Sequence, residues 1–252
     1  MTGSPVAVVT GAARGIGLAI ARRFLAEEWR VALLDIDSGE LGKTTGKPDQ
    51  LLTIACDVSA PDQIQGAVQQ ILARFGRIDA LVNNAGIAVF KPLLETTHEE
   101  WQRVLDVNLT GPFLCSQACA PAMLRNGGGA IVNISSISGL RASTLRVAYG
   151  TSKAALDHLT RQQAAELANL GIRVNAVAPG PVDTAMAKQV HTPEIRAGYH
   201  DAIPLARYGR EEEIAAAVYF LCSPEASYVN GQTLAVDGGF DAAGIGLPSL
   251  RI

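Results

Sequence analysis

Short apolar runs rich in β-branched residues alternate with longer helical patterns along the whole of this 252-residue chain. Seven such runs predict strands: Val6 to Val9, Arg30 to Asp35, Leu51 to Cys56, Ala80 to Asn83, Ala130 to Ile134, Arg173 to Ala178 and Thr233 to Val236. Five helices are predicted between them: Gly15 to Glu28, Pro61 to Phe75, Thr97 to Arg125, Tyr149 to Ala168 and Glu211 to Cys222. The strand runs are apolar throughout, which is typical of parallel strands covered by helices on both faces. The pattern therefore predicts an α/β fold with a doubly wound parallel sheet.

The length and composition favour one folded domain of the Rossmann type over residues 1–252. Hydrophobic residues make up 48% of the chain and charged residues 18%, so a packed core is expected and disorder is not. A net charge of −3 provides no basic field for nucleic acid or anionic lipid. The longest apolar stretches, such as Ile214 to Cys222, are too short for a membrane span. We expect neither nucleic acid nor membrane as a partner.

The four cysteines are too few for a disulfide scaffold and suit a reducing compartment, so we expect a cytoplasmic protein. Cys115 and Cys119 lie four residues apart in a helical stretch, which raises the question of a metal site. Because no histidine accompanies them, we prefer packing in the core and predict no metal.

Two segments and the tail depart from the alternation. Ser38 to Gln50 is polar and glycine-rich, whereas Asp183 to Arg210 is long and irregular and follows a strand end. A loop of that length at that place is predicted to cover a substrate, with room for short helical pieces. The tail from Phe240 to Ile252 has no evident partner in the fold, which leaves subunit contact and fraying both open.

A glycine-rich turn from Thr10 to Gly17 directly follows the first predicted strand and opens into a helix. Its glycines let the backbone turn tightly and approach a pyrophosphate, whose charge the helix N-terminus stabilises. The spacing, Gly-x3-Gly-x-Gly, differs from the common dinucleotide fingerprint, so the turn alone does not exclude an ordinary loop. It supplies the candidate cofactor-binding residues Gly11, Arg14, Gly15, Ile16 and Gly17.

Asp35 stands at the end of the second predicted strand, 18 positions beyond Gly17. A carboxylate there can accept hydrogen bonds from the adenosine ribose and repels the 2′-phosphate of NADP, so we predict NAD as the cofactor. Two observations oppose this prediction: Asp35 can be a solvated strand end, and Arg14 can bind a phosphate.

Tyr149 and Lys153 lie four residues apart at the start of a predicted helix, so they share one face. A tyrosine that acts as a base near neutral pH needs its pKa lowered from about 10 by roughly three units. A neighbouring ammonium group can supply much of that change. Taken alone the pair is a weak signal, because the same spacing occurs on the surface of many helices.

Several motifs in chain order resemble those of the classical short-chain dehydrogenase/reductase family, over essentially the whole chain. The turn at Thr10 to Gly17 resembles the family's cofactor loop, Asp57-Val58 its adenine contact, and Asn83-Asn84-Ala85-Gly86 its motif that steadies the sheet. Pro179 to Thr184 resembles the family's segment over the nicotinamide. The resemblance implies cofactor contacts by Asp57, Val58, Asn84, Ala85, Gly86, Tyr149, Lys153, Pro179, Val182 and Thr184.

The same resemblance implies four catalytic residues, Asn108, Ser136, Tyr149 and Lys153. In the oxidation direction, Tyr149 takes the hydroxyl proton of the substrate as hydride passes to the nicotinamide ring. Ser136 bonds the reacting oxygen, Lys153 holds the nicotinamide ribose and lowers the pKa of Tyr149, and Asn108 holds a water of a proton relay.

The catalytic serine has two rivals. Ser136 lies 13 positions before Tyr149 and forms the family's Ser-x-x-Gly pattern with Gly139. Ser135 and Ser138 break that register, so Ser136 is chosen.

The sequence favours an NAD-dependent dehydrogenase of a small sugar, polyol or hydroxy acid, as a homotetramer if it follows the family. An NADPH-dependent 3-oxoacyl-thioester reductase is the alternative, which Arg14 supports, and a dinucleotide-binding module without turnover is third. Arg146, three residues before Tyr149 and in the same stretch as Arg141, is predicted to hold an anionic group of the substrate. Ser138 is a further candidate substrate contact. A solvated or ion-paired Arg146 is the competing interpretation.

Overall fold

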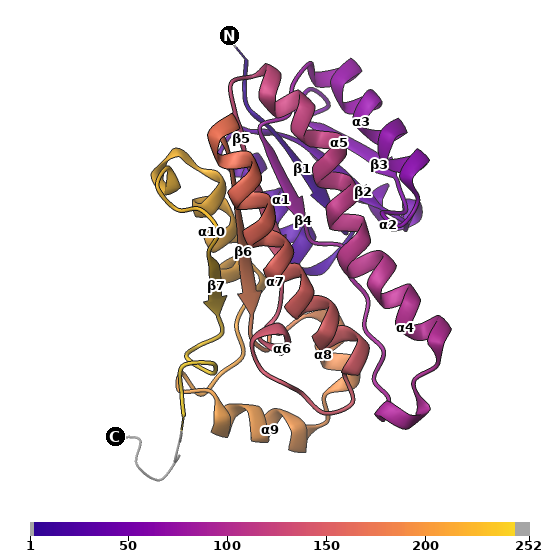
Figure 1. Cartoon of the computed structure of the whole chain (residues 1–252), viewed down its shortest axis with the longest axis vertical. Helices are drawn as coiled ribbons and strands as arrows, with labels where there is room; N and C mark the ends of the chain where they lie inside the picture. Colours follow the sequence, from indigo (N-terminus) through magenta and orange to yellow (C-terminus); the bar gives the residue numbers. More distant parts are fainter. Residues whose placement is uncertain (1–2, 245–252) are drawn as a thin grey trace.

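The computed structural model of the chain describes residues 3–244 (Figure 1). Within them, seven parallel strands form one sheet in the order β3-β2-β1-β4-β5-β6-β7. They are β1 (Val6–Thr10), β2 (Arg30–Asp35), β3 (Leu51–Ala55), β4 (Ala80–Asn83), β5 (Gly129–Ile134), β6 (Ile172–Pro179) and β7 (Thr233–Val236). The strand order reverses between β1 and β4, and doubly wound sheets bind ligands at such a switch point. The predicted doubly wound sheet is therefore confirmed.

Helices cover both faces of this sheet (Figure 1). They are α1 (Gly15–Ala26), α2 (Ser38–Leu41), α3 (Pro61–Phe75), α4 (His98–Leu105), α5 (Gly111–Arg125), α6 (Ile137–Leu140), α7 (Val147–Leu167), α8 (Ala185–Val190), α9 (Pro193–Ala202) and α10 (Glu211–Cys222). A π-helical segment, η2 (Asp106–Thr110), joins α4 to α5. Short 3₁₀ turns occur at Leu93–Glu95, Ala168–Leu170 and Pro224–Ala226.

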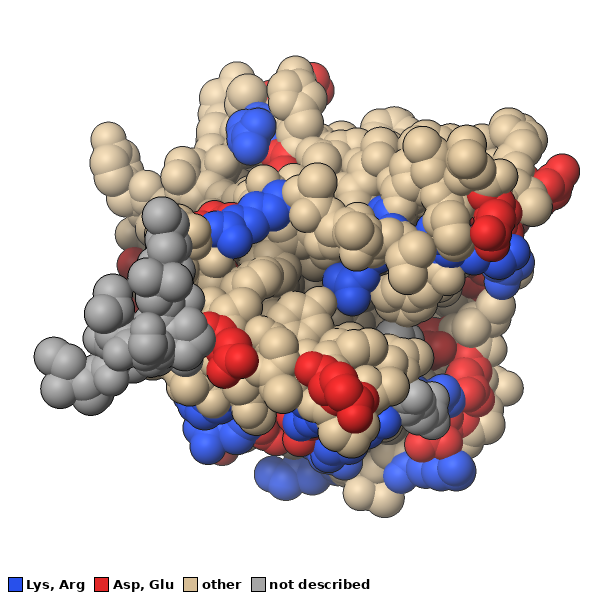
Figure 2. All heavy atoms as spheres, turned by 90° about the horizontal axis from the view of Figure 1, so that it is seen from below, with Lys and Arg blue, Asp and Glu red and all other residues tan. Residues whose placement is uncertain are grey.

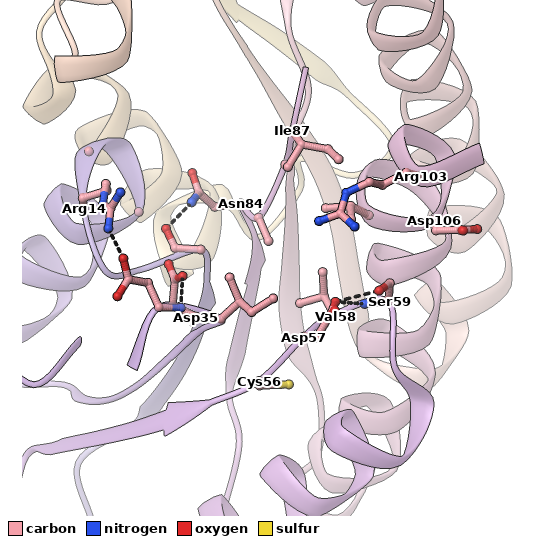
Figure 3. Close-up of a pocket in the computed structure, with 18 of the residues that line it drawn as sticks. Arg14, Asp35, Cys56, Asp57, Val58, Ser59, Asn84, Ile87, Arg103 and Asp106 are labelled. Atoms are coloured by element: carbon pink, nitrogen blue, oxygen red, sulfur yellow. Dashed lines mark hydrogen bonds and ion pairs between the residues drawn. The ribbon is translucent and has the colours of Figure 1, made fainter. Parts of the chain in front are cut away.

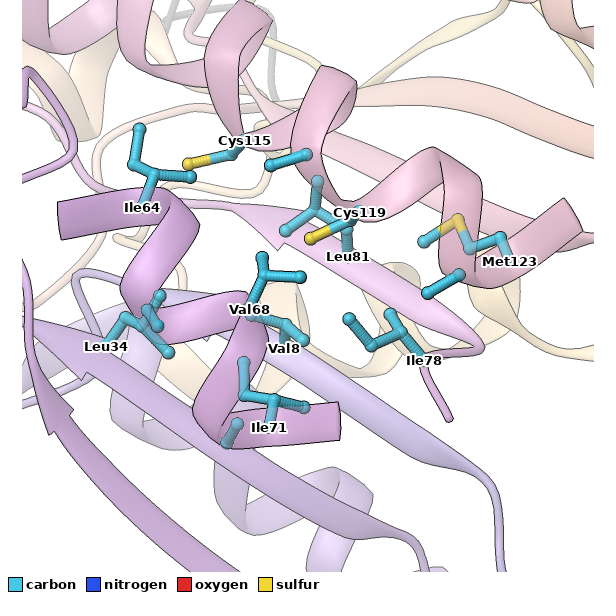
Figure 4. Close-up of a cluster of buried hydrophobic side chains, with 14 of the residues drawn as sticks. Val8, Leu34, Ile64, Val68, Ile71, Ile78, Leu81, Cys115, Cys119 and Met123 are labelled. Carbon is cyan, nitrogen blue, oxygen red and sulfur yellow. The ribbon is translucent and has the colours of Figure 1, made fainter. Parts of the chain in front are cut away.

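Two apolar cores follow from the pleat of the strands. Successive side chains of a strand point to opposite faces, so Val6 and Val8 of β1 join the cluster with α3 and α5, while Val9 joins the cluster with α1 and α10. Figure 4 shows the first cluster, in which Cys115 and Cys119 point from α5 toward the sheet and α3. Both cysteines are buried and free, so they pack in the core as predicted.

The single helix predicted from Thr97 to Arg125 is wrong in its middle. Thr97 caps α4 and forms a capping box with Glu100, and the chain enters η2 at Asp106 before α5 begins. A π turn inserts one extra residue into a helix and is frequent at functional sites, because it changes the direction of a side chain. Asn108 lies in this turn. Apolar periodicity cannot reveal such an insertion, because the flanking helices keep their own pattern.

Residues 183–210 lie at the carboxyl end of the strands, where α9 lies below the sheet in Figure 1. Thr184 caps α8 by accepting a hydrogen bond from Ala187 N at 3.1 Å, and Thr192 caps α9. Ile203 is fully buried behind α9. The predicted loop thus carries two short helices and a buried anchor.

The described part of the tail packs against the rest of the chain. Arg141 forms an ion pair with Asp241 at 3.0 Å, and the Phe240 ring contacts the Tyr199 ring on α9. Residues 245–252 of the predicted tail lie outside the described residues. Between residues 3 and 244, no helix has both the length and the apolar character needed to cross a membrane.

Candidate active site

Two adjoining cavities open at the carboxyl end of the strands, where the surface is hollowed (Figure 2). The larger has a volume of about 870 Å³ and lies between the glycine turn and α4 (Figure 3). Predicted cofactor residues line it: Gly11, Arg14, Gly15, Ile16, Gly17, Asp35, Asp57, Val58, Asn84, Ala85, Gly86 and Thr184. The smaller, about 240 Å³, is lined by Ser136, Arg146, Tyr149, Lys153, Pro179 and Val182. Thr184 and Gly86 line both, so the two cavities are continuous.

The glycine turn presents the N-terminus of α1 to the larger cavity. Gly15 has a φ of +61°. Among residues 3–244, only Glu211 Oε1 comes within 4 Å of where a Cβ at Gly15 would lie, so the backbone is exposed there. A Cβ at Gly17 would lie 2.1 Å from Gly11 O, so the turn also depends on close backbone packing. The N-cap residue Arg14 makes no side-chain cap, which leaves amides of the first turn open to an anion.

The end of β4 is tied to the end of β1. Asn84 Nδ2 donates to Thr10 O at 3.0 Å and to Gly11 O at 2.9 Å. In return, Thr10 Oγ1 accepts hydrogen bonds from the backbone amides of Asn84 and Ala85. The motif at residues 83–86 therefore fixes the glycine turn to the central sheet.

Asp35 is anchored where β2 meets the cavity. Its carboxylate accepts hydrogen bonds from Ala13 N and Asp37 N, each at 3.0 Å. These bonds fix both the glycine turn and the end of β2. Asp37, two residues on, forms an ion pair with Arg14 (Figure 3). Arg14, the feature that opposed NAD in the sequence, is thus engaged by a second carboxylate that the sequence analysis missed.

The opposite wall of the larger cavity comes from the β3 end and α4. The Asp57 carboxylate accepts hydrogen bonds from Ser59 Oγ at 2.7 Å and Ser59 N at 2.8 Å, which lower the pKa of Asp57. Those bonds hold the turn so that buried Val58 lines the cavity. Arg103 on α4 faces it as well, and no local sequence signal separates this arginine from an ordinary solvated one.

Ser136, Tyr149 and Lys153 meet at the head of the smaller cavity. Ser136 follows β5, has extended backbone and accepts Ser138 N at 3.1 Å, which caps α6. Its hydroxyl also hydrogen-bonds Tyr149. One turn along α7, Lys153 Nζ lies 5.7 Å from the centroid of the Tyr149 ring and donates to Ile134 O at 2.7 Å.

Burial dominates the ionisation of this group. It raises the pKa of Tyr149, against the opposing effects of the Ser136 hydrogen bond and the positive charge of Arg146. It also lowers the pKa of Lys153 to about 8, against the charge of Asp157. The predicted lowering of the Tyr149 pKa is therefore wrong for the chain alone, because a desolvated phenolate is costly and Lys153 itself is buried.

Asn108 is fully buried and holds three segments together. Its Oδ1 accepts Ile87 N at 2.8 Å, and its Nδ2 donates to Ile87 O at 2.9 Å and to Ser152 Oγ at 3.0 Å. Ser152 Oγ in turn donates to Tyr149 O at 2.7 Å. The π turn thus places Asn108 between the loop after β4 and α7, and its relay water stays a prediction.

The two substrate candidates have different positions. Arg146 lines the smaller cavity, with its guanidinium 5.1 Å from the centroid of the Phe90 ring. Ser138 is buried, and its Oγ accepts a hydrogen bond from Arg146 Nη1 at 3.3 Å, which helps to hold the guanidinium in place. Arg141, from the same stretch, points to the tail instead.

Comparison with known proteins agrees with this geometry. A family model described as enoyl-(acyl carrier protein) reductase matches residues 11–241. The chain is 42% identical over 248 residues to 2-(R)-hydroxypropyl-CoM dehydrogenase from Xanthobacter autotrophicus, covering 95% of this chain and 99% of that protein. The chain belongs to the classical short-chain dehydrogenase/reductase family. The predicted resemblance is confirmed.

Other members of the short-chain dehydrogenase/reductase family differ in what their names say they act on. The chain is 40% identical over 239 residues to 3-oxoacyl-[acyl-carrier-protein] reductase from Thermotoga maritima, covering 93% of this chain and 96% of that protein. The structure of aldohexose dehydrogenase from Thermoplasma acidophilum superposes with a TM-score of 0.89 at 36% identity, covering 96% of each chain.

As a short-chain dehydrogenase/reductase, this protein is an oxidoreductase of CH–OH or carbonyl groups that uses a nicotinamide cofactor. The larger cavity fits such a dinucleotide. The uncapped α1 N-terminus and the exposed backbone at Gly15 suit a pyrophosphate, and Asp35 lines the same cavity at the end of β2. When bound, the nicotinamide ring supplies the acceptor or donor of a hydride.

Proposed function

We propose that the protein is an NAD-dependent dehydrogenase that reversibly oxidises a secondary hydroxyl of a small polar substrate bearing an anionic group. One observation carries this proposal: Ser136, Tyr149 and Arg146 line one cavity of about 240 Å³ that is continuous with the larger cavity. The proton-transfer group and a cation are therefore within reach of a single small molecule. A sugar acid, a short hydroxy acid or a hydroxyalkyl sulfonate has the matching chemistry.

In this proposal each residue of the site has a separate role. Tyr149 accepts the hydroxyl proton from the substrate, and Ser136 hydrogen-bonds the same oxygen as it becomes a carbonyl. Lys153 holds a ribose hydroxyl of the cofactor and its charge favours tyrosinate. Asn108 fixes the backbone on both sides of the site through its bonds to Ile87 and Ser152.

The choice of NAD rests on two carboxylates at the adenosine end of the larger cavity. Asp35 is fixed by two backbone amides, and Asp37 beside it engages Arg14. A 2′-phosphate would meet both negative charges, and it would have to compete with Asp37 for Arg14. The ribose diol of NAD has no such conflict and can donate hydrogen bonds to Asp35.

The anionic group rests on Arg146, which the Phe90 ring and the Ser138 hydroxyl hold in place. A guanidinium so fixed binds a carboxylate or sulfonate with two parallel hydrogen bonds and little loss of conformational freedom. The relative from Xanthobacter autotrophicus is named 2-(R)-hydroxypropyl-CoM dehydrogenase, and a hydroxypropyl group is consistent with a small hydroxyalkyl substrate.

A substrate screen tests the proposal directly. Sugar acids, hydroxy acids, hydroxyalkyl sulfonates and neutral polyols are each incubated with NAD while NADH absorbance is followed. We expect anionic compounds to have the highest kcat/KM. Arg146→Ala should raise KM for an anionic substrate at least about tenfold and leave its neutral analogue nearly unchanged, whereas Arg146→Lys should fall between. Equal effects on both substrates, or neutral polyols as the best substrates, would refute the anion site.

A second candidate is the NADPH-dependent reduction of 3-oxoacyl thioesters. The observation in its favour is the 40% identity to 3-oxoacyl-[acyl-carrier-protein] reductase from Thermotoga maritima. Acetoacetyl-CoA with NADPH is the probe. If kcat/KM for acetoacetyl-CoA with NADPH exceeds kcat/KM for every alcohol with NAD, the second proposal replaces the first.

We further propose a single domain over residues 1–252 that works in the cytoplasm as a homotetramer. Phe113 on α5 and Leu94 are 44% and 97% exposed, which suits a surface that another subunit covers. Sedimentation velocity measures the assembly, and a monomer at micromolar concentration would contradict it.

A further inference from the structure

Asp157 is a buried carboxylate that the roles described above leave unused. It lies on α7 one turn beyond Lys153 and is 2% exposed. Its Oδ1 accepts a hydrogen bond from Thr233 Oγ1 on β7 at 3.2 Å. Its Oδ2 has no hydrogen-bond partner among residues 3–244. A buried carboxylate with an unsatisfied oxygen is costly, so its presence calls for a compensating charge or task.

The surroundings enclose Asp157 tightly. A Cβ at Gly139 on α6 would lie 2.8 Å from Asp157 Oδ2 and 2.8 Å from the carbonyl carbon of Lys153. Ser135 lies beside the carboxylate, but its hydroxyl donates to Lys153 O at 3.4 Å. These contacts place the Asp157 carboxylate close to Gly139 and to the backbone of Lys153, with Ser135 beside that backbone.

One of the two cations that act on Asp157 is the ammonium group of Lys153. Residues four apart on a helix share a face, so the two side chains extend along the same side of α7. Arg161, on α7 as well, is the other cation that acts on Asp157, and Arg146 is the cation that acts on Tyr149. The neighbours described from β5, β7, α6 and η2 are uncharged: Ser135, Thr233, Gly139 and Asn108.

We propose that Asp157 is a positioning residue that keeps the buried ammonium group of Lys153 protonated and so sets the pH range of the site. The proposal rests on the proposed role of Lys153 in holding the cofactor ribose. Burial lowers the pKa of Lys153 to about 8, and the Asp157 charge is the effect that opposes this fall. Without that charge, Lys153 would lose its proton nearer to neutral pH, and with it a hydrogen-bond donor and the cation beside Tyr149.

The test uses cofactor binding, which needs no identified substrate. The dissociation constant of NADH is measured by fluorescence between pH 6 and pH 10 for the unmodified enzyme and for Asp157→Asn, which keeps the size of the side chain. We expect the affinity of the unmodified enzyme to fall as the pH rises through about 8, when Lys153 loses its proton. In Asp157→Asn this fall should occur at least about one pH unit lower, with equal affinities at pH 6.

Thr233→Val is the matched control, because it removes the hydrogen bond to Asp157 and leaves the carboxylate charge in place. The pH of its affinity fall should stay close to that of the unmodified enzyme. Asp157→Leu serves as a second charge-removing variant if Asp157→Asn folds poorly by circular dichroism. A pH dependence that is the same with and without Asp157, or that Thr233→Val moves as far, overturns the proposal.

A failed substrate screen would affect only the proposed function, because the pH dependence of NADH binding is measured without a substrate.

Discussion

Lys153→Met should make the protein more stable at neutral pH while it removes activity. The lysine is 3% exposed, and burial lowers its pKa from an ordinary 10.5 to about 8. Because one pKa unit corresponds to about 1.36 kcal/mol, keeping Lys153 protonated in the fold at pH 7 costs about 3 kcal/mol. Methionine is similar in length and carries no charge to desolvate. The lost hydrogen bond to Ile134 O offsets about 1 kcal/mol, which leaves a net stabilisation of about 2 kcal/mol.

The stabilisation expected from Lys153→Met depends on pH. The folded-state pKa of Lys153 lies below its unfolded value, so the cost is fully present below pH 8. It diminishes as the pH rises from about 8 to 10.5, because Lys153 is then neutral in the folded state and the free energy of deprotonating it in the unfolded state falls toward zero. Near pH 10.5 the sign should reverse, because the missing hydrogen bond is the only difference that remains.

Urea unfolding at pH 7, 8, 9 and 10, without cofactor and at one protein concentration, measures the difference. Lys47→Met is the control, because Lys47 is exposed and its replacement should change the free energy of unfolding by no more than about 0.5 kcal/mol at any of these pH values. A Lys153→Met variant that is less stable than the unmodified protein at pH 7 would refute the reasoning. So would a stability difference that stays constant from pH 7 to pH 10.

Three further substitutions have expected outcomes. Tyr149→Phe should lower kcat at least about a hundredfold and change NADH affinity less than about twofold, and retention of a tenth of kcat would exclude Tyr149 as the base. The unmodified enzyme should prefer NAD to NADP at least about tenfold in kcat/KM, and Asp35→Ser should narrow the ratio; equal use of both by the unmodified enzyme is the contrary result. Gly17→Ala should lower the free energy of unfolding by about 1–3 kcal/mol and weaken NADH binding, because the added methyl group would clash with Gly11 O. Gly66→Ala on α3 is the control, because a Cβ there has open space, and thermal unfolding should show it to be neutral or stabilising.

The parts of the fold that the sequence could predict are those set by local pattern. The strand from Arg30 to Asp35 is found as predicted, because an apolar run between turn signals is visible without knowing its neighbours. Register singles out Ser136 among three candidate serines, and Ser136 is the one whose hydrogen bond acts on the pKa of Tyr149. Its catalytic role stays a prediction. Motif spacing thus fixed which side chains can meet.

The remaining features depend on contacts between distant segments. Asp37 engages Arg14 only because the glycine turn folds back onto the end of β2. Asp157 reads in the sequence as an ordinary polar position of a helix, and α6 and β7 are what bury it. The direction of the Tyr149 pKa was missed for the same reason, since it depends on how deeply the packed fold desolvates the ring.

The π turn at η2 also changes the phase of the helix that runs through it. In a continuous α-helix, Val104 and Cys115 are eleven residues apart and would lie about 20° apart, on one face. One inserted residue turns them about a quarter turn from each other, so that α4 packs against α7 while Cys115 stays in the core with α3. Deleting one residue from η2 would rotate α4 against α7 and carry Asn108 away from Ile87, whereas replacing Asn108 leaves both helices in phase. Deletion and substitution at this point therefore probe different properties, helix phase in the first case and the hydrogen bonds of one amide in the second.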